Sequence, residues 1–258
     1  MHKPGFTILF AAAVCFVCAI FVSGSAVLLS DRQERNRILD RREKVLAVAG
    51  LVGTGEKVSP ETISKLFEEN IRPLVVDMET GEPQPEVDAA NFDQSAMMAD
   101  PATSHAAPPN QAKVVRVPNQ GLVFQIMDGE TVDGIIIPVE GKGLWSTLYG
   151  YLALDSDGQT IQGITFYQHG ETPGLGGEVD NPRWKSLWSG RKAYDESGEP
   201  KIQVIKGQAG PARQDPYAVD GLSGATLTSR GVTHLVQFWL SEDGFGPYIQ
   251  RYREKSGT

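Results

Sequence analysis

Cysteine is scarce in this sequence. Its 258 residues include two cysteines, Cys15 and Cys18, which lie close to the N-terminus. Zinc sites built from four thiolates and four-cysteine iron–sulfur clusters need more cysteines than that. No disulfide can link residues beyond Cys18 to one another, so the stability of the main body has to come from an apolar core.

Basic residues are also fewer than acidic residues. The chain has 24 Lys and Arg against 32 Asp and Glu, a net charge of −8 and a pI of about 5.1. Proteins that bind nucleic acids neutralise phosphates with clustered basic side chains, so we expect no nucleic-acid partner. With 40% hydrophobic and 22% charged residues, the composition is that of an ordinary globular protein.

Charge of either sign is missing between Gly5 and Ser30. A helix over that range is about 39 Å long, which exceeds the roughly 30 Å of a bilayer's hydrocarbon core. A cleaved signal peptide is the alternative, but its apolar stretch is usually about 7–15 residues long. The bulky Val14 and Val17 before the two cysteines disfavour a lipoprotein signal. We therefore predict one transmembrane helix within residues 1–30.

The charges on either side of this segment bear on its orientation. One lysine, Lys3, precedes it, and six basic residues follow it: Arg32, Arg35, Arg37, Arg41, Arg42 and Lys44. Basic residues accumulate on the cytoplasmic side of membrane helices, so the count alone predicts a cytoplasmic main body. Acidic residues are interspersed among them, and they weigh little in this rule.

Composition distinguishes the next two segments. Residues 31–50 have a helical spacing of apolar and charged side chains, and a second helix is expected after Ser59, which can cap it, and Pro60, within a connecting segment that spans 31–76. We predict a helical connecting segment there. Residues 77–113 hold seven acidic residues and five prolines, with few large apolar side chains. Such a segment buries little surface, so we predict an acidic, proline-rich surface insertion.

The main body, residues 114–258, combines strands with a C-terminal helix. Residues 150–154 and 160–167 flank a polar turn and predict a β-hairpin, and residues 134–139 predict a further strand. Near the C-terminus, five apolar residues recur with helical spacing: Val232, Leu235, Val236, Trp239 and Leu240. This mixture without a regular βαβ alternation indicates an α+β fold.

Three segments rich in glycine carry the candidate site residues: Gly141–Trp145, His169–Gly177 and Asp220–Ser229. None of them has the GxGxxG or GxxxxGK[ST] pattern, so neither a Rossmann site nor a P-loop is supported. In the third segment, small and hydroxylated residues precede the C-terminal helix. Free N–H groups at a helix start favour an anion, which predicts a phosphate-binding turn. The alternative is that Ser223 or Thr226 only caps the helix.

The four histidines are scattered along the sequence: His2, His105, His169 and His234. His169 borders the second glycine-containing segment and either approaches a bound ligand or simply ends a strand. His234 lies within the C-terminal helix and is expected to be a packed residue. We predict no metal site and no catalytic residues.

Together these segments resemble the motifs of a known family. Asp-x-x-Ser-Gly-Ala-Thr at 220–226 is similar to the flavinylation motif of FMN-binding domains, and Glu-Thr-Pro-Gly-Leu-Gly at 171–176 to their companion motif. The order of the motifs, the single N-terminal apolar segment and Gly-Lys-Gly-Leu-Trp at 141–145 resemble the C-type subunits of the Na⁺-translocating NADH:quinone reductases. The resemblance covers most of the chain, except the insertion at 77–113.

The resemblance implies FMN as the cofactor, joined through a phosphoester bond to the hydroxyl of Thr226. A dedicated flavin transferase would take FAD, join FMN to that residue and release AMP. The other site residues that the motifs imply are Asp220, Ser223, Gly224, Ala225, Glu171, Thr172, Gly174, Leu175, Lys142 and Trp145. Of these, Glu171 is expected to order its loop rather than to act as a base.

The resemblance further implies a location, a function and partners. Flavin attachment in this family takes place outside the cytoplasm, which outweighs the charge count and predicts a single-pass inner-membrane protein with a large periplasmic domain. The function implied is electron relay through covalent FMN, alongside the other subunits of a complex that couples NADH oxidation and ubiquinone reduction to Na⁺ export. Two alternatives are the G-type subunit of the ion-translocating ferredoxin:NAD⁺ reductase, which shares both flavin motifs, and a membrane-tethered flavin sensor or scaffold.

Overall fold

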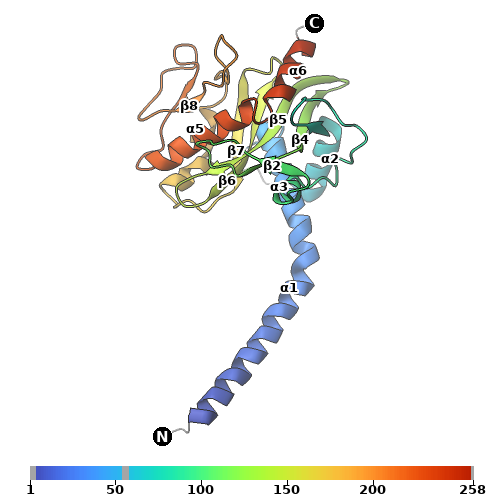
Figure 1. Cartoon of the computed structure of the whole chain (residues 1–258), viewed down its shortest axis with the longest axis vertical. Helices are drawn as coiled ribbons and strands as arrows, with labels where there is room; N and C mark the ends of the chain where they lie inside the picture. The colour runs from blue at the N-terminus through green and yellow to red at the C-terminus, as the bar shows by residue number, and fades with distance from the viewer. Residues whose placement is uncertain (1–3, 54–57, 257–258) are drawn as a thin grey trace. The chain divides into compact units, whose positions relative to one another are not determined.

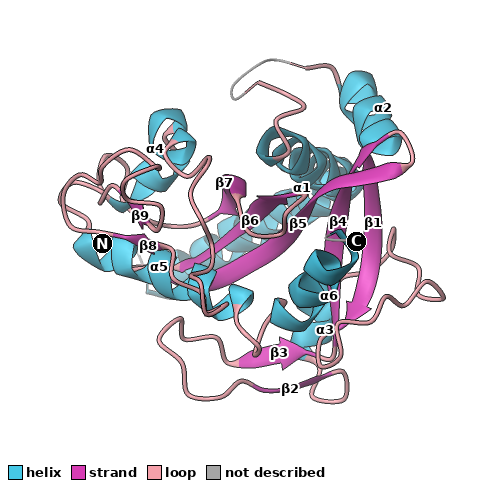
Figure 2. Ribbon diagram, turned by 90° about the horizontal axis from the view of Figure 1, so that it is seen from above, coloured by secondary structure: helices cyan, strands magenta, loops and turns pink. Residues whose placement is uncertain are grey.

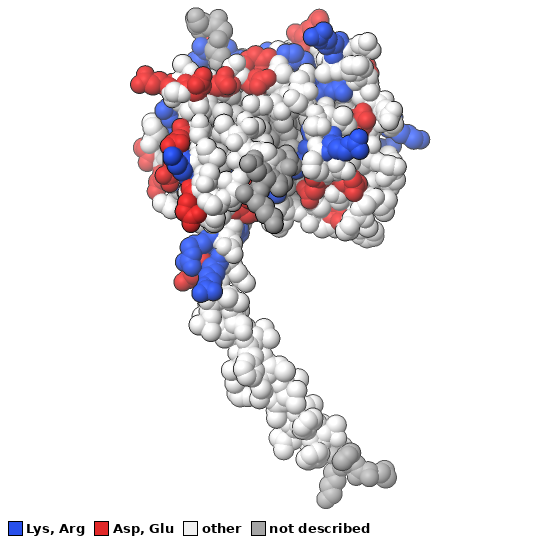
Figure 3. Space-filling model, turned by 180° about the vertical axis from the view of Figure 1, so that it is seen from behind, with Lys and Arg blue, Asp and Glu red and all other residues white. Residues whose placement is uncertain are grey.

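The computed structural model describes residues 4–53 and 58–256. The chain forms two units, Met1–Arg41 and Arg42–Thr258. The described residues of the first unit belong to one long helix, α1 (Pro4–Val48), which Figure 1 shows in blue. An 18-residue window of α1 has a mean hydropathy of 2.7 and no buried residue, so the helix is long and apolar enough to cross a membrane. Figure 3 shows this uncharged stretch and, farther along α1, a cluster of charged side chains.

The second unit is built on a five-stranded antiparallel sheet with the strand order β1-β4-β5-β6-β7. Its strands are β1 (Ile71–Asp77), β4 (Gln120–Asp128), β5 (Thr131–Lys142), β6 (Thr147–Asp155) and β7 (Ile161–Gln168). Strands β6 and β7 form the predicted hairpin, and β5 contains the predicted strand at 134–139. The short strands are β2 (Ser104–Ala106), β3 (Arg116–Pro118), β8 (Gln203–Val204) and β9 (Ala218–Val219).

Helices cover both faces of the sheet, as Figure 2 shows. On one face lie α5 (Thr226–Leu240) and α6 (Gly246–Ser256), and the five apolar residues predicted for the C-terminal helix are all buried in α5. On the other face, Phe67 of α2 (Pro60–Asn70) meets Phe124 of β4 edge to face, with ring centroids 6.1 Å apart. The predicted α+β fold is confirmed.

Local sequence explains where α2 begins. The hydroxyl of Ser59 accepts a hydrogen bond from the N–H of Thr62 at 3.2 Å, and Pro60 occupies the first helical position, as predicted. A serine cap satisfies one of the N–H groups that a helix start leaves free, and proline has no N–H to satisfy.

Close backbone contacts hold α5 against the end of β5. A Cβ atom at Gly231 would lie 2.4 Å from the carbonyl oxygen of Lys142, and one at Gly141 would lie 2.5 Å from Cβ of Leu235. Real atoms do not approach so closely, so only glycine fits at either position. The contact fixes the start of α5 beside the loop that follows β5, and this is where the candidate site lies.

Residues 71–77 differ from the expected helical connecting segment. They form β1, which pairs with β4 along its whole length. The run has three β-branched residues, Ile71, Val75 and Val76, which favour a strand. Pro73 is tolerated because β1 is an edge strand of the sheet.

The segment 77–113 is mostly exposed, as predicted, but it has regular structure of its own. It contains α3 (Gln94–Ala99) and β2, which pairs with β3. The carboxylates of four acidic residues accept hydrogen bonds from backbone N–H groups two or three residues further on: Asp77, Asp88, Asp93 and Asp100. Ala112 is fully buried, and its carbonyl accepts the N–H of Lys142. Side-chain turns and caps therefore order a segment whose composition alone indicated little structure.

Candidate functional site

The carboxylate of Glu171 joins the three glycine-containing segments. Its oxygens accept backbone N–H groups from the loop after β5: Leu144 at 3.2 Å, Trp145 at 2.9 Å and Ser146 at 3.1 Å. The hydroxyl of Thr228, in the first turn of α5, donates to the same carboxylate at 2.6 Å. Glu171 is 5% exposed. One buried anion therefore links Gly141–Trp145, the loop after β7 and the start of α5.

Hydrogen bonding keeps this carboxylate ionised. Burial raises the pKa of Glu171, but the hydrogen bonds from Thr228, Trp145, Ser146 and Leu144 outweigh burial and leave the pKa below its ordinary value of 4.5. A carboxylate that accepts so many donors has no free lone pair directed at a substrate proton. The Glu171 carboxylate therefore holds the loop after β5 against the start of α5.

Two glycines allow the close approach to Glu171. A Cβ atom at Gly143 would lie 2.6 Å from Oε1 of Glu171, and one at Gly176 would lie 2.5 Å from Oγ1 of Thr228. Any larger residue at either position would push the carboxylate away from its donors. These glycines therefore serve the packing of the site rather than a phosphate contact.

The start of α5 has no side-chain cap. Thr226 is the first helical residue, and the residue before it, Ala225, makes no side-chain capping hydrogen bond. Gly224 turns the chain with a φ of +70°, a conformation that favours glycine. Neither Ser223 nor Thr226 acts as the cap, so the capping alternative is wrong. The helix dipole and the first N–H groups are left to attract an anion.

The hydroxyls of the third segment have different surroundings. Thr226 and Ser223 are exposed, whereas Thr228 and Ser229 are buried. The hydroxyl of Thr228 is bound to Glu171, and the hydroxyl of Ser229 accepts the N–H of Leu222 at 3.1 Å. An external enzyme can therefore reach the hydroxyls of Thr226 and Ser223 but not the other two.

Large apolar side chains are exposed on all three segments: Leu144 (41%), Trp145 (68%), Leu175 (45%) and Leu227 (54%). The first two sit on the loop that Glu171 binds, and Leu227 adjoins Thr228. Cδ2 of Leu175 would be 3.0 Å from a Cβ at Gly224, which places it beside the turn before α5. These exposed apolar side chains make the three segments a candidate surface for an apolar ligand.

The remaining predicted residues shape the loops. Asp220 accepts the N–H of Ala209 at 2.9 Å. The carbonyl of Thr172 accepts N–H groups from both Leu175 and Gly177. Gly174 has a φ of +74°, and Nζ of Lys142 donates to the carbonyl of Trp145 at 3.2 Å.

Both nitrogens of His169 are engaged within the loop that it begins. Nδ1 accepts the N–H of Glu171 at 3.2 Å, so the neutral ring carries its proton on Nε2 and donates to Asp180 at 2.8 Å. His234 is partly buried on α5, and burial, followed by the charge of Arg230, lowers its pKa.

The sequence did not identify Thr228 or Ser146 as parts of the site. Ser146 donates its N–H to Glu171 and accepts the N–H of Gly170 at 2.7 Å through its hydroxyl. Thr228 stands two residues beyond the Asp220–Thr226 motif. Both residues act on a carboxylate brought close only by the fold, and no local pattern signals such a contact.

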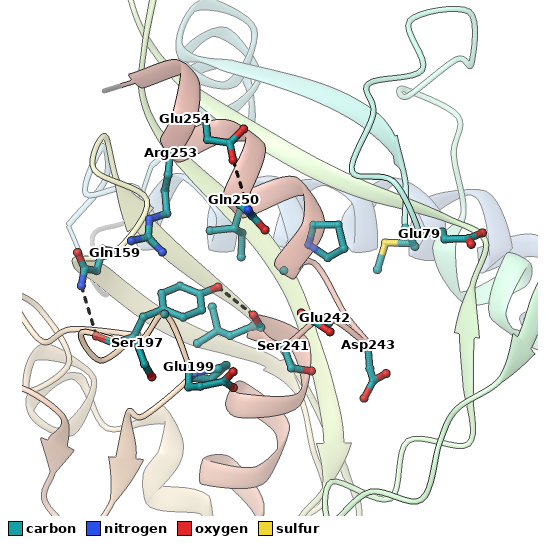
Figure 4. A pocket seen from close by; sticks show the side chains of 18 of the residues that line it. Glu79, Gln159, Ser197, Glu199, Ser241, Glu242, Asp243, Gln250, Arg253 and Glu254 are labelled. Carbon is teal, nitrogen blue, oxygen red and sulfur yellow. Dashed lines mark hydrogen bonds between the residues drawn. The ribbon is translucent and has the colours of Figure 1, made fainter. Parts of the chain in front are cut away.

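A polar groove with a volume of about 1520 Å³ lies at the other end of α5, lined by residues that include Leu240 and Ser241 (Figure 4). Its acidic side chains are Glu79, Asp157, Glu199, Glu242, Asp243 and Glu254. None of the predicted FMN-site residues lines this groove. Thr226 lies about 21 Å from Leu240 along the axis of α5. The acidic lining would repel a phosphate, so this groove is not the candidate site.

A family model described as "FMN-binding domain" matches residues 143–241, which include most of the three segments. Fold and site thus define a protein with an FMN-binding domain that follows a long apolar helix. The chain is 44% identical to the C subunit of the Na⁺-translocating NADH-quinone reductase of Yersinia pestis, over 97% of this chain and 93% of that protein. It is 47% identical to the C subunit of Vibrio parahaemolyticus, over 92% and 91%. The chain belongs to this family of C subunits.

Two crystal structures have the same fold. NqrC of Shewanella oneidensis superposes with a TM-score of 0.77 and 32% identity, over 86% of this chain and 99% of that one. The C subunit of the reductase from Parabacteroides distasonis superposes with a TM-score of 0.65 and 30% identity, over 86% and 96%. The family that the order of motifs indicated is confirmed.

Proposed function

We propose that this chain carries FMN covalently on the side-chain oxygen of Thr226 and relays electrons through it within a Na⁺-translocating NADH-quinone reductase. The observation that carries the proposal is the exposed hydroxyl of Thr226 at the uncapped start of α5. The names of the related proteins supply the complex and its overall reaction.

The described residues fit both ends of an FMN molecule. The uncapped N-terminus of α5 offers N–H groups and the positive end of the helix dipole to the phosphate. Leu144, Trp145, Leu175 and Leu227 offer exposed apolar surface to the isoalloxazine ring. Glu171 holds the loops that carry these side chains in place. When bound, FMN supplies the one- and two-electron chemistry, and the protein supplies binding and orientation.

Attachment requires a second protein. We propose that a flavin transferase uses FAD: the bond between Oγ1 of Thr226 and the FMN phosphorus forms, the pyrophosphate bond of FAD breaks, AMP leaves and the hydroxyl proton is released. The exposure of Thr226 gives such an enzyme access. A covalent link also prevents the loss of FMN from a domain outside the cytoplasm.

The proposed location is the inner membrane, with α1 crossing once and the FMN-binding domain in the periplasm. Protease added to intact spheroplasts should then degrade the domain and leave a cytoplasmic marker protein untouched, because the domain lies outside the membrane. Degradation that requires rupture of the inner membrane would contradict this orientation.

The proteins that purify together with this chain distinguish an electron relay from a flavin sensor or scaffold. A relay subunit must remain close to the other redox centres of its complex. Affinity purification of the tagged full-length chain from its native membranes in mild detergent should therefore recover subunits with many membrane spans, together with NADH-dependent quinone reduction. Recovery of the flavoprotein alone, with the reductase activity left in the flow-through, would favour the sensor or scaffold.

A further inference from the structure

Arg230 is an exposed cation near the start of α5 with no partner in the described structure. It makes no hydrogen bond or ion pair with any residue in 4–53 or 58–256, although its charge reaches His234. Some other arginines of the domain are engaged: Arg191 donates to two backbone carbonyls, and Arg251 pairs with Glu82 at 2.8 Å.

Helix geometry places Arg230 beside Thr226. The two residues are four apart, so they occupy the same side of α5 on successive turns. Long side chains on a helix lean toward its N-terminus and cover the preceding turn. An arginine side chain at position 230 is therefore placed to reach the first turn of α5, where Thr226 and Leu227 are exposed.

The charges along α5 are unfavourable without an anion. A helix N-terminus carries a partial positive charge, which acidic residues normally offset and an arginine increases. The first turn of α5 has no acidic residue, and the helix as a whole has none. Glu171 is nearby, but it is buried and occupied by Thr228 and the loop N–H groups. Arg230 also lowers the pKa of His234, after burial, so the two side chains repel as cations.

The geometry points to Arg230 as the residue that pairs with the phosphodiester joining FMN to Thr226. This inference rests on the proposed function, because it needs the phosphate on Thr226. A phosphodiester bears one negative charge, and guanidinium groups form short, charge-assisted hydrogen bonds with phosphate oxygens. Arg230 acts as a positioning residue: it holds the phosphate over the first turn of α5, beside Leu227 and the apolar surface for the ring.

The test uses the full-length protein in detergent, produced with and without the flavin transferase. Arginine side-chain N–H resonances are compared in the two forms by NMR, and Arg230 is assigned through Arg230→Lys. We expect the Nε–H resonance of Arg230 to shift on flavinylation and to exchange more slowly with water. Arg213 is the matched control, because it is exposed and has no hydrogen bond or ion pair among the described residues. Its resonance should not move.

A second measurement follows the ³¹P NMR resonance of the phosphate that joins FMN to the protein. In flavinylated Arg230→Gln, the ³¹P resonance should move toward its position in the denatured protein, whereas Arg213→Gln should keep the wild-type position. The assignment of Arg230 is overturned if its resonance does not change on flavinylation, or if the ³¹P resonance has the same position in Arg230→Gln and in wild type. Either result leaves the proposal of covalent FMN standing. A wild-type protein with no covalent flavin overturns the proposed function and this inference with it.

Discussion

Replacing Thr226 by alanine should give a folded protein that carries no covalent flavin. The substitution removes the hydroxyl to which the phosphoester is proposed to be attached, so the expected effect is complete loss of the linkage. Thr226 is exposed, and its side chain makes no hydrogen bond within the described structure. Alanine is well tolerated in a helix, so stability should change by less than about 0.5 kcal/mol. Flavin fluorescence of the denatured protein in a gel, under ultraviolet light, measures the result.

The structure selects the control for this experiment. Thr228 and Ser229 are nearby hydroxyls, but they are buried and bonded, so replacing them would disturb the site. Ser223 is the matched control, because it is an exposed hydroxyl three residues before Thr226 in the same motif. Ser223→Ala should keep its fluorescence, and Thr226→Ser should keep part of it. Fluorescence that survives in Thr226→Ala but disappears in Ser223→Ala would move the linkage to Ser223.

Replacing Glu171 by glutamine should destabilise the domain by about 2 kcal/mol at neutral pH. The amide has one acceptor oxygen in place of two, so its NH₂ group must face at least one of the backbone N–H groups that the carboxylate accepts. Donors that meet donors in a buried site lose their hydrogen bonds and stay desolvated. Urea unfolding of the full-length protein in detergent measures the change. Glu196→Gln is the control, because Glu196 is exposed and its side chain makes no hydrogen bond or ion pair among the described residues.

The effect of Glu171→Gln should depend on pH. The pKa of Glu171 is lower in the folded protein than its ordinary value of 4.5. The carboxylate therefore contributes its full stabilisation above that ordinary value and loses it as the pH falls through the lower, folded pKa. The stability gap between Glu171→Gln and wild type should be widest at pH 7 and should narrow below about pH 4. A gap that stays constant with pH would mean that the charge of Glu171 does not hold the loop.

Local patterns in the sequence were sufficient to predict α5 and the start of α2. The helical spacing of Val232, Leu235 and Trp239 predicted α5, and its residues are buried as expected. Ser59 and Pro60 predicted the start of α2. In each case the side chain that determines the element lies within a few residues of it, so the sequence carries the signal.

Features that depend on distant partners were not predictable. Strand β1 belongs to the sheet only because β4, some 50 residues further on, supplies its hydrogen bonds. Thr228 and Ser146 acquire their role from Glu171, which the chain brings to them from other loops. The composition of 77–113 predicted only a surface insertion, yet several of its acidic residues form turns and caps, which depend on their positions in the sequence.

The most direct test of the account is the position of FMN on the chain. Trypsin cleaves after Arg213 and Arg230, and the peptide between these sites, residues 214–230, holds all four hydroxyls of the Asp220–Ser229 segment. Fragmentation of this peptide, from full-length protein produced with its flavin transferase, locates any added mass. The account predicts an increase equal to FMN less water on Thr226 alone. An unmodified peptide, or the added mass on Ser223, Thr228 or Ser229, would contradict it.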